Sequence, residues 1–175
     1  MFYKIQLKDY VDLSPDLFEG DLFASIQEQL TRNYTEKTTE DLGLVLTIVS
    51  VDDVGDGFKL PEDPARHYQV TFTILAYKPE LHEVLEGDVT SVTNFGVFVD
   101  MGVIDGLVHL SQTMFDQVSF SDSGVLLGSQ TGQILKVGSK VRASVVAVSF
   151  RDIRNVKVGL TMRQPGLGAI EWLAE

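Results

Sequence analysis

Apolar and polar residues alternate at the start of the chain, and the period then lengthens to that of a helix. Residues 2–8 place Tyr3, Ile5 and Leu7 on one face, which predicts a strand, whereas residues 21–33 carry one apolar stripe at helical spacing (Leu22, Phe23, Ile26 and Leu30). Two stretches rich in β-branched and aromatic residues, 44–51 and 68–77, predict two more strands. Because the stripe must pack on a sheet, this order predicts a small α+β domain.

Two polar connections interrupt this first domain. Ser14 and Pro15 have the character of a helix cap and a first-turn proline, which predicts a short helical turn. Residues 55–66, GDGFKLPEDPAR, form a long loop of a kind that is often functional, although a plain hairpin tip fits the sequence equally well. Pro79 limits strand continuation, and we therefore expect two domains, 1–80 and 81–175.

The second half of the chain predicts an all-β domain. Short strands separated by glycine-rich turns are expected near residues 83–93, 97–101, 106–110, 141–149 and 156–162. Five such strands match a closed barrel of the OB type. Residues 111–140 would be an insertion in which Phe115, Val118 and Phe120 are candidates for burial, and the last ten residues predict a short helix. The predicted fold class is α+β followed by all-β.

The candidate chemistry lies in residues 86–111, EGDVTSVTNFGVFVDMGVIDGLVHLS. Side chains alternate between the faces of a strand, so if Val97 and Val99 fill a core, Phe98 faces outward. Phe95 stands just before a glycine, and His109 ends the next predicted strand. Such a face would let unpaired bases stack. The alternative is that both phenylalanines are ordinary barrel core.

The charge distribution qualifies this picture. The net charge is -11, which opposes phosphate binding, but residues 1–80 contain 15 acidic and 7 basic side chains. The other seven basic residues all lie between Lys136 and Arg163, where Asp152 is the only acid. A basic stripe near the last barrel strands suits a single-strand binder, although a solvated face with ordinary surface lysines is the alternative.

Catalysis, metals and cofactors find little support in the sequence. The chain has no cysteine and only three histidines, which leaves neither a thiol nucleophile nor a histidine-rich metal cluster. The acidic string DDVGDG fails the EF-hand spacing, and GDGFKL is no phosphate loop. No apolar run reaches the length of a membrane span and no signal peptide is evident, so we expect an intracellular protein without cofactor, metal or membrane.

The barrel motif resembles a known family, the OB-fold RNA-binding repeat first described in a large ribosomal protein of the small subunit. Its hallmarks are a Gly-Asp-Val opening, then Phe-Gly-x-Phe-Val, then Gly-Leu-x-His-x-Ser. All three are present, in the order Gly87, Asp88, Val89, Phe95, Gly96, Phe98, Val99, Gly106, Leu107, His109 and Ser111. The resemblance implies RNA contacts at Phe95, Phe98 and His109.

The family also tends to place an acidic residue four positions before a basic one near the last strand. The basic position falls on Lys157, but Asp152 lies five positions before it. The resemblance therefore gives Asp152 as a candidate RNA-site residue in a longer loop, in which Arg151 or Arg154 can replace part of its role.

The whole chain resembles the larger stalk subunit of archaeal and eukaryotic DNA-directed RNA polymerases. The strings that carry this are FYKIQLKDYVDLSP, GLVLTIVSVDDVGDG, YKPELHEVLEGDV and VGLTMRQPGLGAIEW, and the last favours the archaeal form. The resemblance implies a truncated RNP-like tip domain that docks on the polymerase core through Pro15, Phe18, Gly55 and Gly57. It also implies a smaller stalk subunit as partner, binding of single-stranded nascent RNA, and a cytoplasmic location, or a nuclear one if eukaryotic.

Two other functions remain compatible with the residues. A free-standing single-stranded RNA binder in translation or RNA decay would use the same barrel, with the first domain serving to dimerise. A scaffold would use the barrel for protein contacts and would bind no RNA.

Overall fold

The computed structural model of the chain describes residues 1–121, 123–150 and 156–173. The chain divides into two units, Met1–Lys78 and Pro79–Glu175. None of the helices in the described part combines the length and the apolar character needed to cross a membrane.

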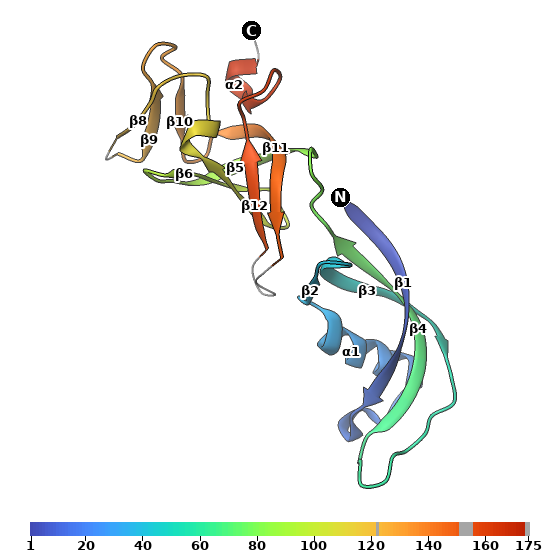
Figure 1. The fold of residues 1–175 in the computed structure, drawn as a ribbon. Coiled ribbons are helices and arrows are strands. Elements are labelled where there is room, and N and C mark those ends of the chain that lie inside the picture. The colour runs from blue at the N-terminus through green and yellow to red at the C-terminus, as the bar shows by residue number, and fades with distance from the viewer. Residues whose placement is uncertain (122, 151–155, 174–175) are drawn as a thin grey trace. The chain divides into compact units, whose positions relative to one another are not determined.

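The first unit is an antiparallel sheet covered on one face by a helix (Figure 1). The strands lie in the order β1, β4, β3, β2, with bounds Phe2–Leu13, Arg66–Tyr77, Gly43–Val54 and Thr38–Thr39. Helix α1 spans Leu22–Tyr34, and the Asp21 side chain caps it by accepting the amide of Ala24 at 3.0 Å. A one-turn 3-10 helix, Pro15–Leu17, follows β1.

The core of this unit forms where the apolar stripe of α1 meets the alternating face of the sheet. The fully buried members are Val11, Ile26, Leu30, Val45, Val70, Phe72, Ile74 and Ala76. The expected strand and helix positions are confirmed, and so is the alternation in residues 2–8, where the odd-numbered residues are half-buried and the even-numbered ones exposed.

The predicted strand ends at Lys8 because Asp9 interrupts the apolar alternation, whereas β1 itself continues five residues further, to Leu13. Asp9 pairs with the buried Val70 and falls in phase with Leu7 and Val11, but its side chain is exposed. There its carboxylate accepts a hydrogen bond from the hydroxyl of Tyr34, the last residue of α1. Burial first, and this bond second, raise the pKa of Tyr34 well above its usual range. The acid therefore ties the helix to the strand, and apolar alternation resumes at Val11.

The second unit contains the predicted closed barrel of five strands. In chain order the barrel strands are β5 (Val84–Val92), β6 (Gly96–Asp100), β7 (Asp105–His109), β11 (Lys140–Ser149) and β12 (Lys157–Thr161). Neighbours pair antiparallel except β7 and β12, whose parallel pairing closes the barrel through Val158–Gly106 and Leu160–Val108. The centre is filled by valines, leucines and methionines of the second unit.

The inserted segment between β7 and β11 forms a sheet of its own, which the sequence did not predict. It begins with a 3-10 turn, Leu110–Gln112, and continues with three short antiparallel strands, β8 (Val118–Ser121), β9 (Val125–Gly128) and β10 (Ile134–Lys136) (Figure 1).

The residues that hold this inserted sheet to the barrel differ from those expected. The expectation that Phe115 and Phe120 are buried is wrong, since they are 65% and 39% exposed, while Val118 is half-buried. Leu126 and Leu135 are fully buried and join the barrel core. The alternation of such short strands is too brief to show which face is inward.

The chain end packs back on the barrel. A two-residue strand, β13 (Gly168–Ala169), pairs with β11, and helix α2 (Ile170–Leu173) follows. Trp172 of α2 packs against the barrel core, which confirms the expectation of a short docked helix.

Candidate nucleic-acid interface

The outer face of β6 and β7 carries the aromatic residues that the sequence singled out. Val97 and Val99 are 0% and 1% exposed, so they lie in the barrel core, and Phe98 between them is turned to the other face. Phe95 is 49% exposed, Phe98 is half-buried and His109 is exposed. The alternative that both rings are barrel core is therefore wrong. We call Phe95, Phe98 and His109 the aromatic platform.

Gly96 leaves room for this platform. It pairs with His109 across β6 and β7, so no side chain on β6 stands opposite the imidazole. A Cβ atom at Gly96 would collide with the carbonyl oxygen of Val108 and lie 3.2 Å from the His109 Cα. Beside it, the Phe95 and Phe98 rings make an edge-to-face pair with centroids 6.1 Å apart and planes at 89°. Two ring planes at right angles offer stacking surfaces in two directions.

The imidazole of His109 is oriented by the chain that follows it. Its Nδ1 lies 3.3 Å from the Ser111 amide, which donates to it, and 2.9 Å from the Ser111 hydroxyl. Because Nδ1 is an acceptor here, the neutral ring carries its proton on Nε2. His109 can therefore donate one hydrogen bond from Nε2 to a base edge or a phosphate oxygen.

A groove of about 620 Å³ runs from the platform across the barrel surface. Its floor follows one register row over four strands, in which Phe98 pairs with Leu107, Leu107 with Gly159, and Gly159 with Ala147. Gly159 and Ala147 are small, so the groove becomes deeper with distance from the Phe98 ring. The sequence motif includes Leu107 but gives no signal for Gly159 or Ala147, which only the barrel closure brings beside it.

One cation stands at the groove in the described part of the second unit. Lys157 is exposed at the start of β12 and lines the groove together with His109. Asp105 also lines it. Arg151, Asp152 and Arg154 lie outside the described residues.

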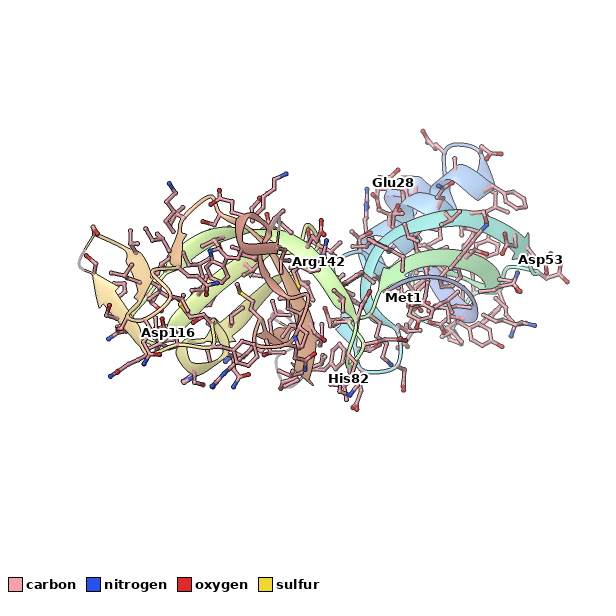
Figure 2. The ribbon with its side chains drawn as sticks, turned by 90° about the horizontal axis from the view of Figure 1, so that it is seen from above. Met1, Glu28, Asp53, His82, Asp116 and Arg142 are labelled. Carbon is pink, nitrogen blue, oxygen red and sulfur yellow. The ribbon has the colours of Figure 1, made fainter. Side chains whose placement is uncertain are left out.

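The basic stripe that the sequence predicts does not lie wholly on this face. Arg142 of β11, labelled in Figure 2, donates to Glu86 of β5 at 2.7 and 2.9 Å and does not line the groove. Lys136 and Lys140 are exposed but are not among the residues that line it. Among the described basic residues, charge at the groove therefore rests on Lys157.

The four residues expected to dock on a polymerase lie at one end of the first unit. Strand β1 ends beside Arg66, the first residue of β4, and β3 ends beside Val70. The turn at Pro15 and the loop at Gly55 and Gly57 therefore leave the sheet at the same end, seen at the lower end of β1 and β4 in Figure 1. Phe18 is held there by the Arg66 guanidinium, 4.9 Å from its ring centroid.

The long loop at this end is anchored to the sheet by His67. Phe58 exchanges two backbone hydrogen bonds with His67, at 3.0 and 2.9 Å, and its ring stacks on the imidazole at 5.4 Å between centroids. Nδ1 of His67 lies 2.5 Å from Asp12 and Nε2 lies 3.0 Å from Asp63. A Cβ atom at Gly57 would lie 2.5 Å from the Tyr68 ring, so a larger residue there would displace that ring. The loop is therefore more than a plain hairpin tip.

These two carboxylates change the ionisation of the ring. Burial alone lowers the pKa of His67, but the hydrogen bonds to Asp12 and Asp63 outweigh it and raise the pKa above its ordinary 6.5. The Ala65 amide first, and His67 in addition, lower the pKa of Asp63.

In the described part of the chain, no group of three or more histidine, aspartate and glutamate side chains is arranged to hold a metal ion.

Comparison with known families assigns both units. Residues 8–64 match the SHS2 domain found in the N terminus of Rpb7p/Rpc25p/MJ0397, and residues 78–156 match the S1 RNA binding domain. The fold and the two matches define a class of protein that joins an SHS2 domain to an S1 barrel. The resemblance of the barrel motif to the ribosomal RNA-binding repeat is thereby confirmed.

Full-length relatives carry the assignment further. The chain is 38% identical to DNA-directed RNA polymerase subunit Rpo7 of Sulfolobus acidocaldarius over 174 residues, which are 99% of this chain and 95% of that protein. It is 37% identical to the subunit Rpo7 of Saccharolobus shibatae, over 100% of this chain and 98% of that protein. Identity to DNA-directed RNA polymerase III subunit RPC8 of Bos taurus is 26%, over 87% of this chain and 78% of that protein.

The chain belongs to the Rpo7 family of DNA-directed RNA polymerase subunits. It is thus a subunit of a nucleotidyltransferase complex that acts in transcription. The higher identity to the archaeal relatives confirms that the archaeal form of the family is favoured.

Proposed function

We propose that this subunit docks on the RNA polymerase core through the first unit and holds emerging single-stranded RNA on the barrel of the second. It has no catalytic residues of its own and pairs with a smaller stalk subunit. It acts in the cytoplasm, or in the nucleus if the source is eukaryotic. The observation that carries the RNA function is the aromatic platform, which opens onto the groove beside Lys157.

The chemistry of the platform suits a sequence-tolerant grip on RNA. Every base has a π-face, so exposed rings bind unpaired bases without reading their edges. The groove floor of Leu107, Gly159 and Ala147 is apolar, and Lys157 supplies one charge for a phosphate. The candidate RNA-binding residues are thus Phe95, Phe98, His109 and Lys157, and the family pattern adds Arg151, Asp152 and Arg154.

The first unit suits a docking role rather than RNA binding. Its strongly acidic composition repels phosphate, and its loop and turn project from one end of the sheet. Pro15, Phe18, Gly55 and Gly57 are the proposed contacts with the polymerase core. His67 and its two carboxylate partners fix the loop in the shape that docks.

Affinity purification of the tagged chain from its native cells tests the docking role. Polymerase subunits, with a smaller subunit in equal amount, are the expected co-purifying proteins. The variant Asp56→Lys, which reverses a charge between Gly55 and Gly57, should weaken that recovery. Asp41→Lys is the control, because Asp41 is equally exposed but precedes β3 at the other end of the sheet.

Two results would contradict the proposal. Recovery of ribosomes or nucleases in place of polymerase would favour the free-standing RNA binder. Equal polymerase recovery with both variants would show that the loop is not the docking end.

A further inference from the structure

Phe115 is an exposed aromatic residue that neither the motif nor the groove accounts for. It precedes the inserted sheet, and its exposed fraction of 65% is the largest among the described large apolar residues. The Arg163 guanidinium lies 5.3 Å from the centroid of its ring. An exposed ring beside a cation resembles the chemistry of the platform more than that of a core.

The position of Arg163 is fixed by the 3-10 turn that follows His109. The backbone carbonyl of Gln112 accepts a hydrogen bond from the Met162 amide at 2.9 Å, and the side-chain oxygen of Gln112 accepts one from the Thr161 hydroxyl at 2.8 Å. Arg163 in turn donates through Nη1 to the carbonyl oxygen of Ser111 at 3.3 Å. The end of β12 is thereby tied to the turn, so the guanidinium is held in place before any ligand arrives.

His109 connects this site to the platform. A second hollow, of about 260 Å³, is lined by His109, Leu110, Ser111, Asp116, Val118 and Arg163. His109 lines both this hollow and the larger groove. Ring side chains therefore follow one another from Phe98 through His109 toward Arg163, whose guanidinium lies against the Phe115 ring.

The one acid of the second hollow is engaged by the chain itself. Asp116, labelled in Figure 2, accepts the amides of Gln130 and Thr131 at 2.8 Å through Oδ2 and that of Gln117 at 2.6 Å through Oδ1. The Thr131 amide first, with the other donors, lowers the pKa of Asp116, so it stays ionised. The backbone donors hold the Asp116 carboxylate, which leaves the Phe115 ring and the Arg163 guanidinium as the binding elements.

We propose that the RNA track continues beyond His109 onto this second station, made of Phe115 and Arg163. A further unpaired base stacks on the Phe115 ring, and the guanidinium binds the adjoining phosphate. Within the described residues, Ser111 is the only hydrogen-bond acceptor of the Arg163 side chain, which leaves several of its five N–H donors for that phosphate. This inference rests on the RNA-binding function proposed above.

Oligonucleotides of two lengths test the extension with the full-length chain. Unstructured RNAs of about 4 and about 10 nucleotides, within the range that single OB barrels bind, are titrated by fluorescence anisotropy. Phe115→Ala should weaken binding of the longer RNA by roughly 5- to 150-fold, the worth of one stacked base, and leave the shorter one unchanged. Arg163→Ala should do the same and lower the log–log salt slope by about 0.7.

Matched variants control for fold and charge. Phe120→Ala removes an exposed ring from the same inserted segment, and Lys140→Ala removes a positive charge outside both hollows. Neither control variant should change the affinity for the longer RNA relative to that for the shorter one. Phe115→Tyr keeps the ring and should restore binding, whereas Arg163→Lys keeps the charge without the planar fork and should restore it only in part.

The outcomes distinguish this inference from the function beneath it. If Phe98→Ala weakens both RNAs while Phe115→Ala and Arg163→Ala behave like their controls, the second station is refuted and the platform stands. If Phe98→Ala has no effect on either length, both fail. If the Phe115 variant instead loses the smaller subunit on purification and binds RNA normally, the surface belongs to a protein partner and the inference is overturned.

Discussion

Replacing Phe98 by alanine tests the aromatic platform most directly. The ring is half-buried on the outer face of β6, between two valines that are almost fully buried in the core. Phe98→Ala leaves both valines and the strand pairing in place. We therefore expect the barrel to keep its fold and the effect to fall on RNA binding.

The expected magnitude has two parts. Losing one base stacked on an aromatic ring costs about 1–3 kcal/mol of RNA binding free energy. Phe98 also holds Phe95 through their edge-to-face contact at 6.1 Å, and such pairs contribute about 0.5–1.5 kcal/mol. Phe95 should therefore be less well oriented in Phe98→Ala. The loss of RNA binding free energy in the double variant should then be smaller than the sum of the two single losses, by about the energy of the ring pair.

Anisotropy titration with an RNA of about 4 nucleotides measures the four affinities of this cycle. Thermal unfolding and near-ultraviolet circular dichroism of each variant check the fold. If the losses of RNA binding free energy in Phe98→Ala and Phe95→Ala simply add up in the double variant, a shared platform is refuted. Unchanged affinity in Phe98→Ala, with the fold intact, would refute the assigned surface altogether.

Three further predictions concern stability. Gly96→Ala should cost about 1–3 kcal/mol, since its Cβ meets backbone in β7, whereas Gly20→Ala, whose Cβ has only an ordinary contact at 3.6 Å, should cost little; chemical denaturation compares them. Leu126→Ala should destabilise the second unit by about 2–5 kcal/mol, and Leu127→Ala, exposed on the same strand, should not. The stabilisation from His67, whose folded pKa is raised above 6.5, should be complete below pH 6.5 and lost as pH rises through that higher value. Two-dimensional NMR titration of the imidazole measures that pKa, and a value at or below 6.5 would contradict the ion-pair geometry.

The sequence predicted the platform well because one strand face is buried and the other is open. Val97 and Val99 are buried and Phe98 between them is only half-buried, as the period of two along a strand requires once the valines fill the core. Predicting the length of β1 was harder, because Asp9 puts an exposed carboxylate in phase with the core-facing residues of the strand, where it accepts the Tyr34 hydroxyl.

The inserted sheet and the second station could not be predicted for a different reason. Its strands have only three or four residues, too few to establish a period, and Phe115 precedes them in a connection without alternation. Burial is the default expectation for an aromatic residue. The neighbour of its ring, Arg163, is placed there by the Gln112 and Ser111 contacts, which join residues 49 and 52 positions apart.

The shared core of the inserted sheet and the barrel limits how far the second unit can be shortened. Leu126 and Leu135 supply fully buried side chains to the interior that the five barrel strands enclose. Deleting residues 114–138 to obtain a minimal five-stranded protein would leave a cavity in the apolar core of the barrel. A surviving truncation would need larger side chains on the strands that remain.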